Sequence, residues 1–248
     1  MKRIIKRWAR PLIKTNIISG LIQYRKFISD WRAFQKMEGA ERISLKDSYP
    51  CLFDNTSTFS PGNHYFYQDI WAFKKIYDSK VKLHIDVGSK ANFVGFLTSI
   101  TNVEFVDIRS LNAPYLKNFK NIQGSILEMP YEDSSLQSVS CLHVAEHIGL
   151  GRYGDSLDPL GTQKAAAELS RCLAKGGNLY FSLPVGKPKV CFNAHRIHSP
   201  RQILEYFSNL KLLDFSVYND KKEFVENTSV ETVENAKFAC GMFRFTKV

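Results

Sequence analysis

The sequence lacks paired cysteines, long apolar runs and internal repeats. Its five cysteines, Cys51, Cys141, Cys172, Cys191 and Cys240, form no CxxC pair and show no spacing typical of metal ligands. An odd number of scattered thiols is typical of a reducing compartment, so we expect a cytoplasmic protein without a disulfide framework. No stretch approaches the roughly 20 apolar residues that span a bilayer. These absences exclude a disulfide scaffold and a membrane-spanning protein.

We also expect no cleavable export signal. Residues 1–22 alternate basic and apolar side chains, but Arg10 and Lys14 interrupt the apolar part and no small-residue cleavage site follows. We therefore expect no export. The 248 residues, 44% of them hydrophobic and 13% aromatic, suffice for a sizeable core.

The positive charge is concentrated near the N-terminus. The sequence holds 34 Lys and Arg against 24 Asp and Glu, but residues 1–46 contain 12 of the basic residues and three of the acidic ones. The other positions carry 22 basic and 21 acidic residues and are nearly neutral. This balance argues against a nucleic-acid groove across the main domain.

The charge pattern suggests three parts. Residues 1–46 are predicted to be a basic amphipathic helical extension, 47–80 a turn-rich linker followed by a helix, and 81–248 the main domain. Residues 1–37 are predicted to contact an anionic membrane surface peripherally, on its cytoplasmic face. The alternative is a helix that packs on the main domain or on another copy, with its charges merely solvated. The sequence does not set the oligomeric state.

Three short apolar runs predict buried parallel strands. KLHID, VEFVD and SVSCLHV each end in a polar residue or a turn, and the connections are long enough for crossover helices. The carboxyl ends of such strands form a ligand-binding crevice, where we expect Asp86, Gly88, Asp107, Ser125 and Glu146 to converge. A carboxylate at the end of the second strand, Asp107, suits the two hydroxyls of a ribose.

Later segments extend the α/β pattern. TQKAAAELSRCLAKGG predicts a helix closed by glycine, NLYFSLPV a strand, and SPRQILEYFS a helix capped by Ser199 with Pro200 at its first position. KLLDFSVY and AKFACGMFRFTKV predict two late strands.

The order of these motifs resembles class I S-adenosylmethionine-dependent methyltransferases, and within them a bacterial branch associated with surface-polysaccharide biosynthesis. The resemblance covers about residues 64–220 and is carried most specifically by LEMPYEDSSLQSVSCLHVAEHI, RCLAKGGNLYFSLPVG and FNAHRIHSP. It implies a Rossmann-like α/β sandwich with a mostly parallel seven-stranded sheet, an antiparallel last strand and an N-terminal helical extension. In similar enzymes the helix before the first strand covers the cofactor, which makes Tyr67 and Gln68 candidate cofactor neighbours. Packing of the aromatic residues in the core is the alternative and is favoured.

The resemblance also implies a set of cofactor-binding residues. S-adenosyl-L-methionine would contact Asp86 and Gly88 at its amino-acid end, Asp107 at the ribose, and Ser125 and Ile126 at the adenine. The first motif departs from the usual pattern, because DVGSKANFVG has one glycine directly after the acid where many relatives have two or three.

Three histidines are candidates for the base that removes a proton from the methyl acceptor. His143 ends the fourth predicted strand, His147 begins the next element, and His195 lies in the loop after the fifth strand. A packed structural histidine remains the alternative for each of them. His143, Glu146 and His147 also spell the H-x-x-E-H pattern of zinc peptidases, but they straddle a predicted strand end and not one helix, so we expect no metal site.

Four further residues are predicted to bind the acceptor. Arg152, Tyr153 and Asp155 lie in the glycine-rich segment 149–161 and combine a cation, an aromatic ring and a carboxylate, as suits a sugar. The alternative is a folded loop whose polar groups satisfy one another. Arg196 is predicted to clamp an acidic group of the acceptor.

These features predict an enzyme that transfers a methyl group to a hydroxyl of a glycan or sugar-linked small molecule during surface-polysaccharide assembly. The alternative is a non-catalytic cofactor-binding scaffold held at the membrane surface by its basic N-terminus. A nucleotide-dependent oxidoreductase is disfavoured, because a two-phosphate cofactor needs a fuller glycine fingerprint than DVGSKANF.

Overall fold

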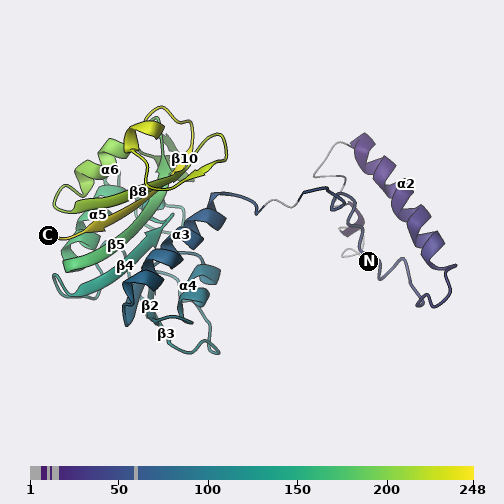
Figure 1. Ribbon diagram of the computed structural model, residues 1–248, viewed down its shortest axis with the longest axis horizontal. Coiled ribbons are helices and arrows are strands. Elements are labelled where there is room, and N and C mark those ends of the chain that lie inside the picture. The colour runs from purple at the N-terminus through teal and green to yellow at the C-terminus, as the bar shows by residue number, and fades with distance from the viewer. Residues whose placement is uncertain (1–6, 10–11, 13–16, 59–60) are drawn as a thin grey trace. The chain divides into compact units, whose positions relative to one another are not determined.

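The computed structural model describes residues 7–9, 12, 17–58 and 61–248 (Figure 1). The chain divides into two compact units, Met1–Pro61 and Gly62–Val248. Part of the segment predicted to contact a membrane, residues 1–6, 10–11 and 13–16, lies outside the described residues.

The first unit contains helix α2, Ile17–Phe34. The apolar side chains of its first turns, Ile17, Ile18, Leu21 and Ile22, are each more than half exposed. Tyr24 stacks on Trp8 with ring centroids 5.8 Å apart. Among the described residues, no helix has the length and apolar character needed to cross a membrane.

The second unit is built on an eight-stranded sheet in the order β3-β2-β1-β4-β5-β10-β8-β9. Strands β1 to β5 are parallel where they pair, whereas β10 is antiparallel to both β5 and β8. The strands are β1 Leu83–Val87, β2 Asn102–Asp107, β3 Phe119–Gln123, β4 Leu136–Leu142, β5 Leu173–Val185, β8 Lys211–Tyr218, β9 Phe224–Val225 and β10 Ala239–Thr246. The predicted parallel sheet with an antiparallel ending is confirmed, and the short edge strand β9 is an addition.

Helices cover both faces of this sheet (Figure 1). Helices α3, His64–Ser79, and α4, Ala91–Leu97, lie on one face, and α5, Gly161–Cys172, and α6, Pro200–Tyr206, on the other. Two short 3-10 helices, η1 Ala145–His147 and η2 Val230–Val233, and a hairpin of β6, Lys189–Cys191, and β7, His195–Ile197, complete the unit.

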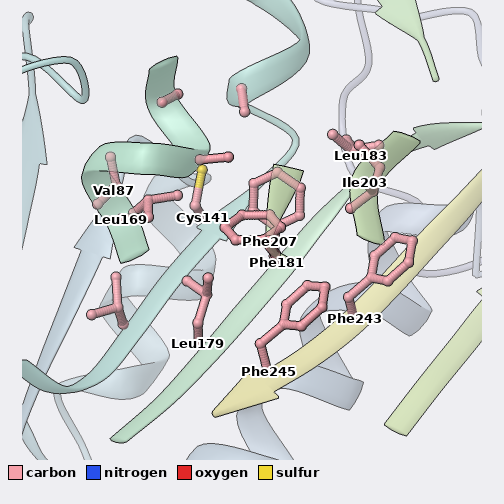
Figure 2. Close-up of a cluster of buried hydrophobic side chains, with 14 of the residues drawn as sticks. Val87, Cys141, Leu169, Leu179, Phe181, Leu183, Ile203, Phe207, Phe243 and Phe245 are labelled. Atoms are coloured by element: carbon pink, nitrogen blue, oxygen red, sulfur yellow. The ribbon is translucent and has the colours of Figure 1, made fainter. Parts of the chain in front are cut away.

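Successive side chains of β5 point to opposite faces of the sheet and contribute to a hydrophobic core on each face. Phe181 packs edge-on against Phe207 beneath α6, with centroids 4.9 Å apart (Figure 2). The neighbouring Tyr180 points to the other face and packs against Trp71 of α3. Each face therefore has its own apolar cluster, as the period-2 side-chain geometry of a central strand requires.

The helix ends follow from identifiable residues. Ser199 caps α6, accepting from the Gln202 backbone at 3.1 Å while the Gln202 side chain accepts from Ser199, so the predicted cap is confirmed. The helix predicted to run through TQKAAAELSRCLAKGG was too long. It ends at Cys172, because Leu173 already pairs with Leu136 in the sheet.

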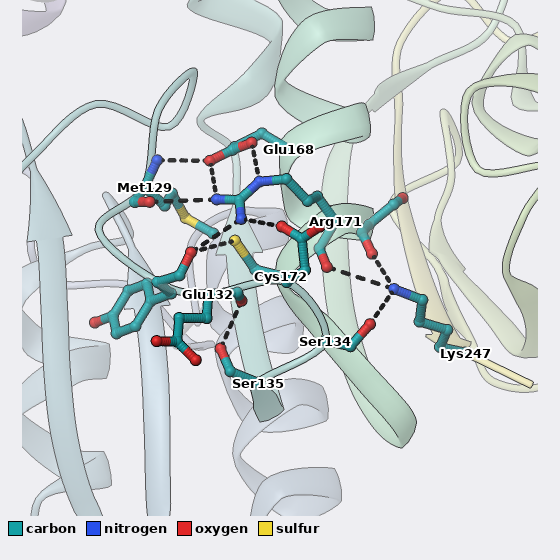
Figure 3. A network of polar contacts seen from close by, with 11 residues as sticks. Met129, Glu132, Ser134, Ser135, Glu168, Arg171, Cys172 and Lys247 are labelled. Carbon is teal, nitrogen blue, oxygen red and sulfur yellow. Dashed lines mark hydrogen bonds and ion pairs between the residues drawn. The ribbon is translucent and has the colours of Figure 1, made fainter.

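A polar network fixes the segment between β3 and β4 (Figure 3). Arg171, in the last turn of α5, donates to both carboxylate oxygens of Glu168 and to the carbonyl of Met129. Glu168 in turn accepts from the backbone of Met129 at 2.7 Å. These bonds anchor the segment that carries Ser125 and Ile126.

Candidate functional site

The carboxyl ends of β1, β2 and β4 meet at a hollow. It is called the cofactor-side cavity because four of the residues predicted to bind the cofactor, Gly88, Asp107, Ser125 and Ile126, line it, together with His143, His147, Tyr153, Asp155 and others. Gly88 has φ +66°, and a Cβ there would lie 3.1 Å from Val144 and 3.5 Å from the Asp107 carboxylate. Only glycine adopts this conformation without strain, and its missing side chain leaves the space open.

Asp107 and Arg109 form the polar side of the cofactor-side cavity. The Asp107 carboxylate accepts from the Arg109 backbone at 2.7 Å and from its Nε at 3.3 Å. The Asp107 side chain is 11% exposed and that of Arg109 61%. The guanidinium of Arg109 lies 4.4 Å from the ring centroid of Tyr153. The carboxylate thus faces the cavity with a cation as its present partner.

Asp86 lies beneath this cavity and does not line it. Its fully buried carboxylate accepts from the Ser89 backbone at 3.0 Å and from the Ser140 hydroxyl. Burial raises the pKa of Asp86 to about 6, although the hydrogen bonds from Ser140 and Ser89 oppose the rise. The hydrogen-bond network extends to His84, whose ring nitrogens lie 2.8 Å from the Ser140 hydroxyl and 2.7 Å from the Ser138 hydroxyl. Asp86 therefore holds the turn that contains Gly88.

Ser125 and Ile126 line the opposite wall. The Ser125 hydroxyl accepts from the Leu127 backbone at 3.1 Å, and Ser125 forms a β-bridge with Glu128. Ile126 is buried against the large core. Both residues are held by the segment that Arg171 anchors.

A second hollow adjoins the first. It is called the acceptor-side cavity because Arg152 and Tyr153, predicted to bind an acceptor, line it, together with His64, Tyr65, Lys90, Glu146, His195, Phe238 and others. It shares Gly88, Arg109, His143, His147 and Tyr153 with the cofactor-side cavity. The two hollows therefore meet at the end of β4.

His143 and Glu146 form a buried ion pair at this junction. Nδ1 of His143 lies 2.8 Å from Glu146 Oε1, and Nε2 lies 3.3 Å from the sulfur of Cys240. Burial alone would lower the pKa of His143, but the charge on Glu146 and the contact with the Cys240 sulfur outweigh it and raise the pKa to about 10. Burial likewise favours neutral Glu146, but the imidazolium outweighs it and lowers the pKa of the carboxyl. His143 is therefore a cation at neutral pH.

His147 and His195 have different surroundings. Nδ1 of His147 lies 2.6 Å from the carbonyl oxygen of Ala194, and Nε2 lies 3.7 Å from Glu146 Oε1. Among the described residues, the nitrogens of the His195 ring have no hydrogen-bond partner, and the ring packs edge-on against Phe238. Burial lowers the pKa of His195. Both rings line the acceptor-side cavity.

The 149–160 loop, residues 149–160, forms part of the wall of both cavities. Asp155 folds it by accepting from the backbones of Gly149, Gly151 and Tyr153. Arg152 donates to the carbonyl of Ala194 at 3.0 Å. Asp155 thus shapes the loop, while Arg152 and Tyr153 present their side chains to the acceptor-side cavity.

Arg196 is placed apart from the other predicted binding residues. It is buried and donates to the carbonyl oxygens of Ile148 and Asp158, the latter at 2.9 Å. It lines neither cavity. Its guanidinium joins the 149–160 loop to the hairpin of residues 189–197.

Sequence reasoning missed several cavity residues. Lys90 directly follows the glycine motif, and its ammonium lies 3.1 Å from the centroid of Tyr65. His64 stacks on His143 with centroids 4.6 Å apart, and Phe238 contacts His64. The position of Lys90 beside a predicted ligand-binding turn was a usable signal, whereas Phe238 is brought in by the fold alone.

The H-x-x-E-H pattern does not lie on one α-helix. His143 sits at the end of β4 in the left-handed conformation, at φ +56°, and His147 lies in the 3-10 helix η1. In the part of the chain that the structure describes, no group of three or more His, Cys, Asp or Glu is arranged to hold a metal ion.

Solved structures share this fold at low sequence identity. A 1,6-didemethyltoxoflavin-N1-methyltransferase from Burkholderia thailandensis aligns with a TM-score of 0.52 and 10% identity over 73% of this chain and 79% of its own. A geranyl diphosphate methyltransferase in complex with SAM aligns with a TM-score of 0.53 and 13% identity, over 76% and 93% of the two chains. The [4+2]-cyclase SpnF aligns with a TM-score of 0.54 and 11% identity over 77% of this chain and 84% of its own. The chain thus has the class I methyltransferase fold, on which more than one reaction is found.

The sequence itself gives one family assignment. The comparison with curated proteins finds no match. The family described as "Caenorhabditis protein of unknown function, DUF268" matches residues 106–240, more than half of the chain. This range starts in β2 and reaches β10, so it contains Asp107, the His143 and Glu146 pair and the 149–160 loop. The chain, with its two adjoining cavities on a class I methyltransferase fold, therefore belongs to the DUF268 family.

Proposed function

We propose that this protein is an S-adenosylmethionine-dependent methyltransferase that methylates a hydroxyl group. The observation that carries the proposal is the junction of two cavities at the end of β4, one with a ribose-type carboxylate and the other with histidines. The arrangement suits an enzyme that must hold a cofactor and an acceptor next to each other.

The residues of the cofactor-side cavity fit this cofactor. A Cβ at Gly88 would enter the space beside Asp107, so the glycine keeps the backbone open to a ligand. Asp107 would bind the ribose hydroxyls, and Ser125 and Ile126 would contact the adenine. Asp86 would act from below by fixing the turn. When bound, S-adenosylmethionine supplies an activated methyl group on its sulfonium.

His147 is the base that we assign to the acceptor. Its Nδ1 lies 2.6 Å from the Ala194 carbonyl oxygen and 3.3 Å from the Arg152 guanidinium. The shorter contact favours the tautomer with the proton on Nδ1, so that Nε2, which lies 3.7 Å from Glu146 Oε1, is the nitrogen that accepts a proton. His143 is held as a cation by Glu146 and is suited to orienting groups at the junction. His195 is the second candidate for the base, with unpartnered ring nitrogens among the described residues.

Cofactor binding tests the proposal first. We would titrate S-adenosylmethionine and S-adenosylhomocysteine into the full chain by calorimetry, with NAD as the control ligand and Asp107→Ala alongside. Binding of both sulfur compounds, lost in the variant, supports the proposal. Binding of NAD alone, or no binding of either compound, contradicts it.

The assignment of the base needs an acceptor screen over nucleotide sugars and lipid-linked glycans. The glycan acceptor and the role in surface-polysaccharide assembly come from the sequence resemblance and stay predictions. With an active acceptor, His147→Asn is expected to lower kcat by about 100-fold or more while cofactor affinity is kept. A larger loss in His195→Asn would transfer the role to His195.

A non-catalytic, cofactor-binding scaffold at the membrane is the second candidate. It is favoured by the exposed apolar turns of α2, with Ile18, Leu21 and Ile22 beside Arg25 and Lys26. This pattern supports peripheral contact with an anionic, cytoplasmic membrane face through residues 1–37. Replacing the three apolar residues by serine in the full chain is expected to abolish co-sedimentation with anionic vesicles. A protein that binds vesicles and cofactor but methylates no acceptor would favour the scaffold.

A further inference from the structure

Two cations line the acceptor-side cavity without a carboxylate partner. Among the described residues, neither Lys90 nor Arg152 forms an ion pair, whereas Arg109 on the same wall pairs with Asp107. Lys90 lies over the ring of Tyr65, and Arg152 donates to a backbone carbonyl. Asp69 acts on the charge of Lys90 only from beyond ion-pair distance. Both cations are exposed enough to reach a ligand.

The acidic residues of this cavity do not balance that charge. Glu146 is the one carboxylate that lines it, among the residues the structure describes, and its charge is matched by His143. The acceptor-side cavity therefore carries a net positive charge from Lys90 and Arg152. A concave surface with excess charge of one sign concentrates ligands of the opposite sign.

Glu146 offers a second recognition feature. Its side chain is fully buried, and within the described structure Oε2 has no hydrogen-bond partner. A buried carboxylate oxygen without a donor is costly, so a ligand hydroxyl that donates to it would be bound favourably. The aromatic rings of Tyr65, Tyr153 and Phe238 line the same cavity and suit the apolar face of a sugar ring.

We propose that the acceptor-side cavity binds an acidic sugar, with its carboxylate or phosphate held by Lys90 and Arg152 and one hydroxyl donated to Glu146. This inference rests on the proposed function insofar as the bound sugar is the methyl acceptor. In this proposal Lys90 and Arg152, and not the predicted Arg196, bind the acidic group of the sugar. Arg196 instead joins the 149–160 loop to the hairpin.

Three probes that share one ring test this charge preference. Glucuronate, glucose 1-phosphate and glucose would be titrated calorimetrically into the full chain in the presence of S-adenosylhomocysteine. We expect at least one of the two acids to bind at least about tenfold more tightly than glucose, because each exposed charge-assisted contact contributes up to about threefold to tenfold. The acid that binds more tightly identifies the group as a carboxylate or a phosphate.

Matched double variants locate the site. Lys90→Met with Arg152→Gln is expected to remove the preference for acids, and its melting temperature is compared with that of the wild type because Arg152 also donates to the Ala194 carbonyl. Lys117→Met with Arg201→Gln changes two cations outside both cavities and is expected to keep the preference. Equal binding of glucose and the acids, no binding of any probe, or a preference that survives in the first double variant would overturn the inference.

The titration also separates this inference from the proposed function. S-adenosylhomocysteine binding is measured first and depends on Asp107. If it binds and the acids show no preference, the acidic-sugar inference fails alone. If it does not bind but the acids still bind through Lys90 and Arg152, the proposed methyltransferase fails and the anion site stands.

Discussion

The buried pair of His143 and Glu146 supports a quantitative prediction. Glu146→Gln keeps the shape of the side chain and removes its charge, so the imidazolium of His143 loses its counter-charge. Burial then dominates, and the pKa of His143 is expected to fall from about 10 to below its ordinary value of 6.5. The ring becomes largely neutral at pH 7 in the variant.

The effect on folding has a defined pH dependence. Because the folded-state pKa of His143 lies above its ordinary value, its contribution to stability is fully present below pH 6.5 and is lost as the pH rises through about 10. Glu146 has a lowered pKa, so its contribution is lost as the pH falls below 4.5. One pKa unit corresponds to about 1.4 kcal/mol, so His143 contributes about 4 kcal/mol at pH 7 and about 1 kcal/mol at pH 9.

Urea unfolding at the two pH values measures this dependence. The difference in unfolding free energy between wild type and Glu146→Gln is expected to shrink by about 3 kcal/mol from pH 7 to pH 9. Glu226→Gln, an exposed site, serves as the control and is expected to change little at either pH. The reasoning is refuted if the difference is the same at both pH values, or if NMR finds His143 titrating near 6.5 in the wild type.

Two further predictions concern single residues. Arg109→Gln removes the cation that now occupies the Asp107 carboxylate, so S-adenosylhomocysteine is expected to bind up to about fivefold more tightly in calorimetry, and weaker binding would argue against competition. Burial lowers the pKa of His84 to about 3, so stability is lost as the pH falls through its ordinary value of 6.5. At pH 4 this loss amounts to about 3 kcal/mol of unfolding free energy, measured by urea unfolding, and His84→Gln is expected to remove it. An equal loss in the wild type and in His84→Gln would contradict the assignment of the loss to His84.

Much of the sheet could be predicted, because its central strands are buried on both faces. The runs KLHID, VEFVD and SVSCLHV correspond to β1, β2 and β4. Strand β3 was missed because FKNIQ lies at the sheet edge with a half-exposed pattern and has no apolar run. The start of β5 was missed because LAKGG has the residues of a helix end, whereas pairing of Leu173 with Leu136 decides the strand.

The site was harder to predict than the sheet, because partners decide which polar side chains are free. The sequence offers Arg152 and Arg196 as equivalent cations in neighbouring loops. The fold gives Arg196 two backbone carbonyls in a buried position and leaves Arg152 at the cavity. The charge state of His143 likewise depends on Glu146, three residues away, and on Cys240 from β10. Such pairings arise from tertiary contacts that no local pattern encodes.

The attachment of the 149–160 loop limits how the acceptor side can be redesigned. Arg196 reaches from the 189–197 hairpin to the carbonyl of Ile148, just before the loop, and to that of Asp158 within it, and Arg152 reaches back from the loop to Ala194 in the hairpin. A transplanted loop whose backbone does not place a carbonyl where that of Asp158 lies would leave the buried guanidinium without one of its acceptors. The loop and the hairpin therefore form one structural unit, and a graft that aims to change the proposed acceptor site should carry both segments together.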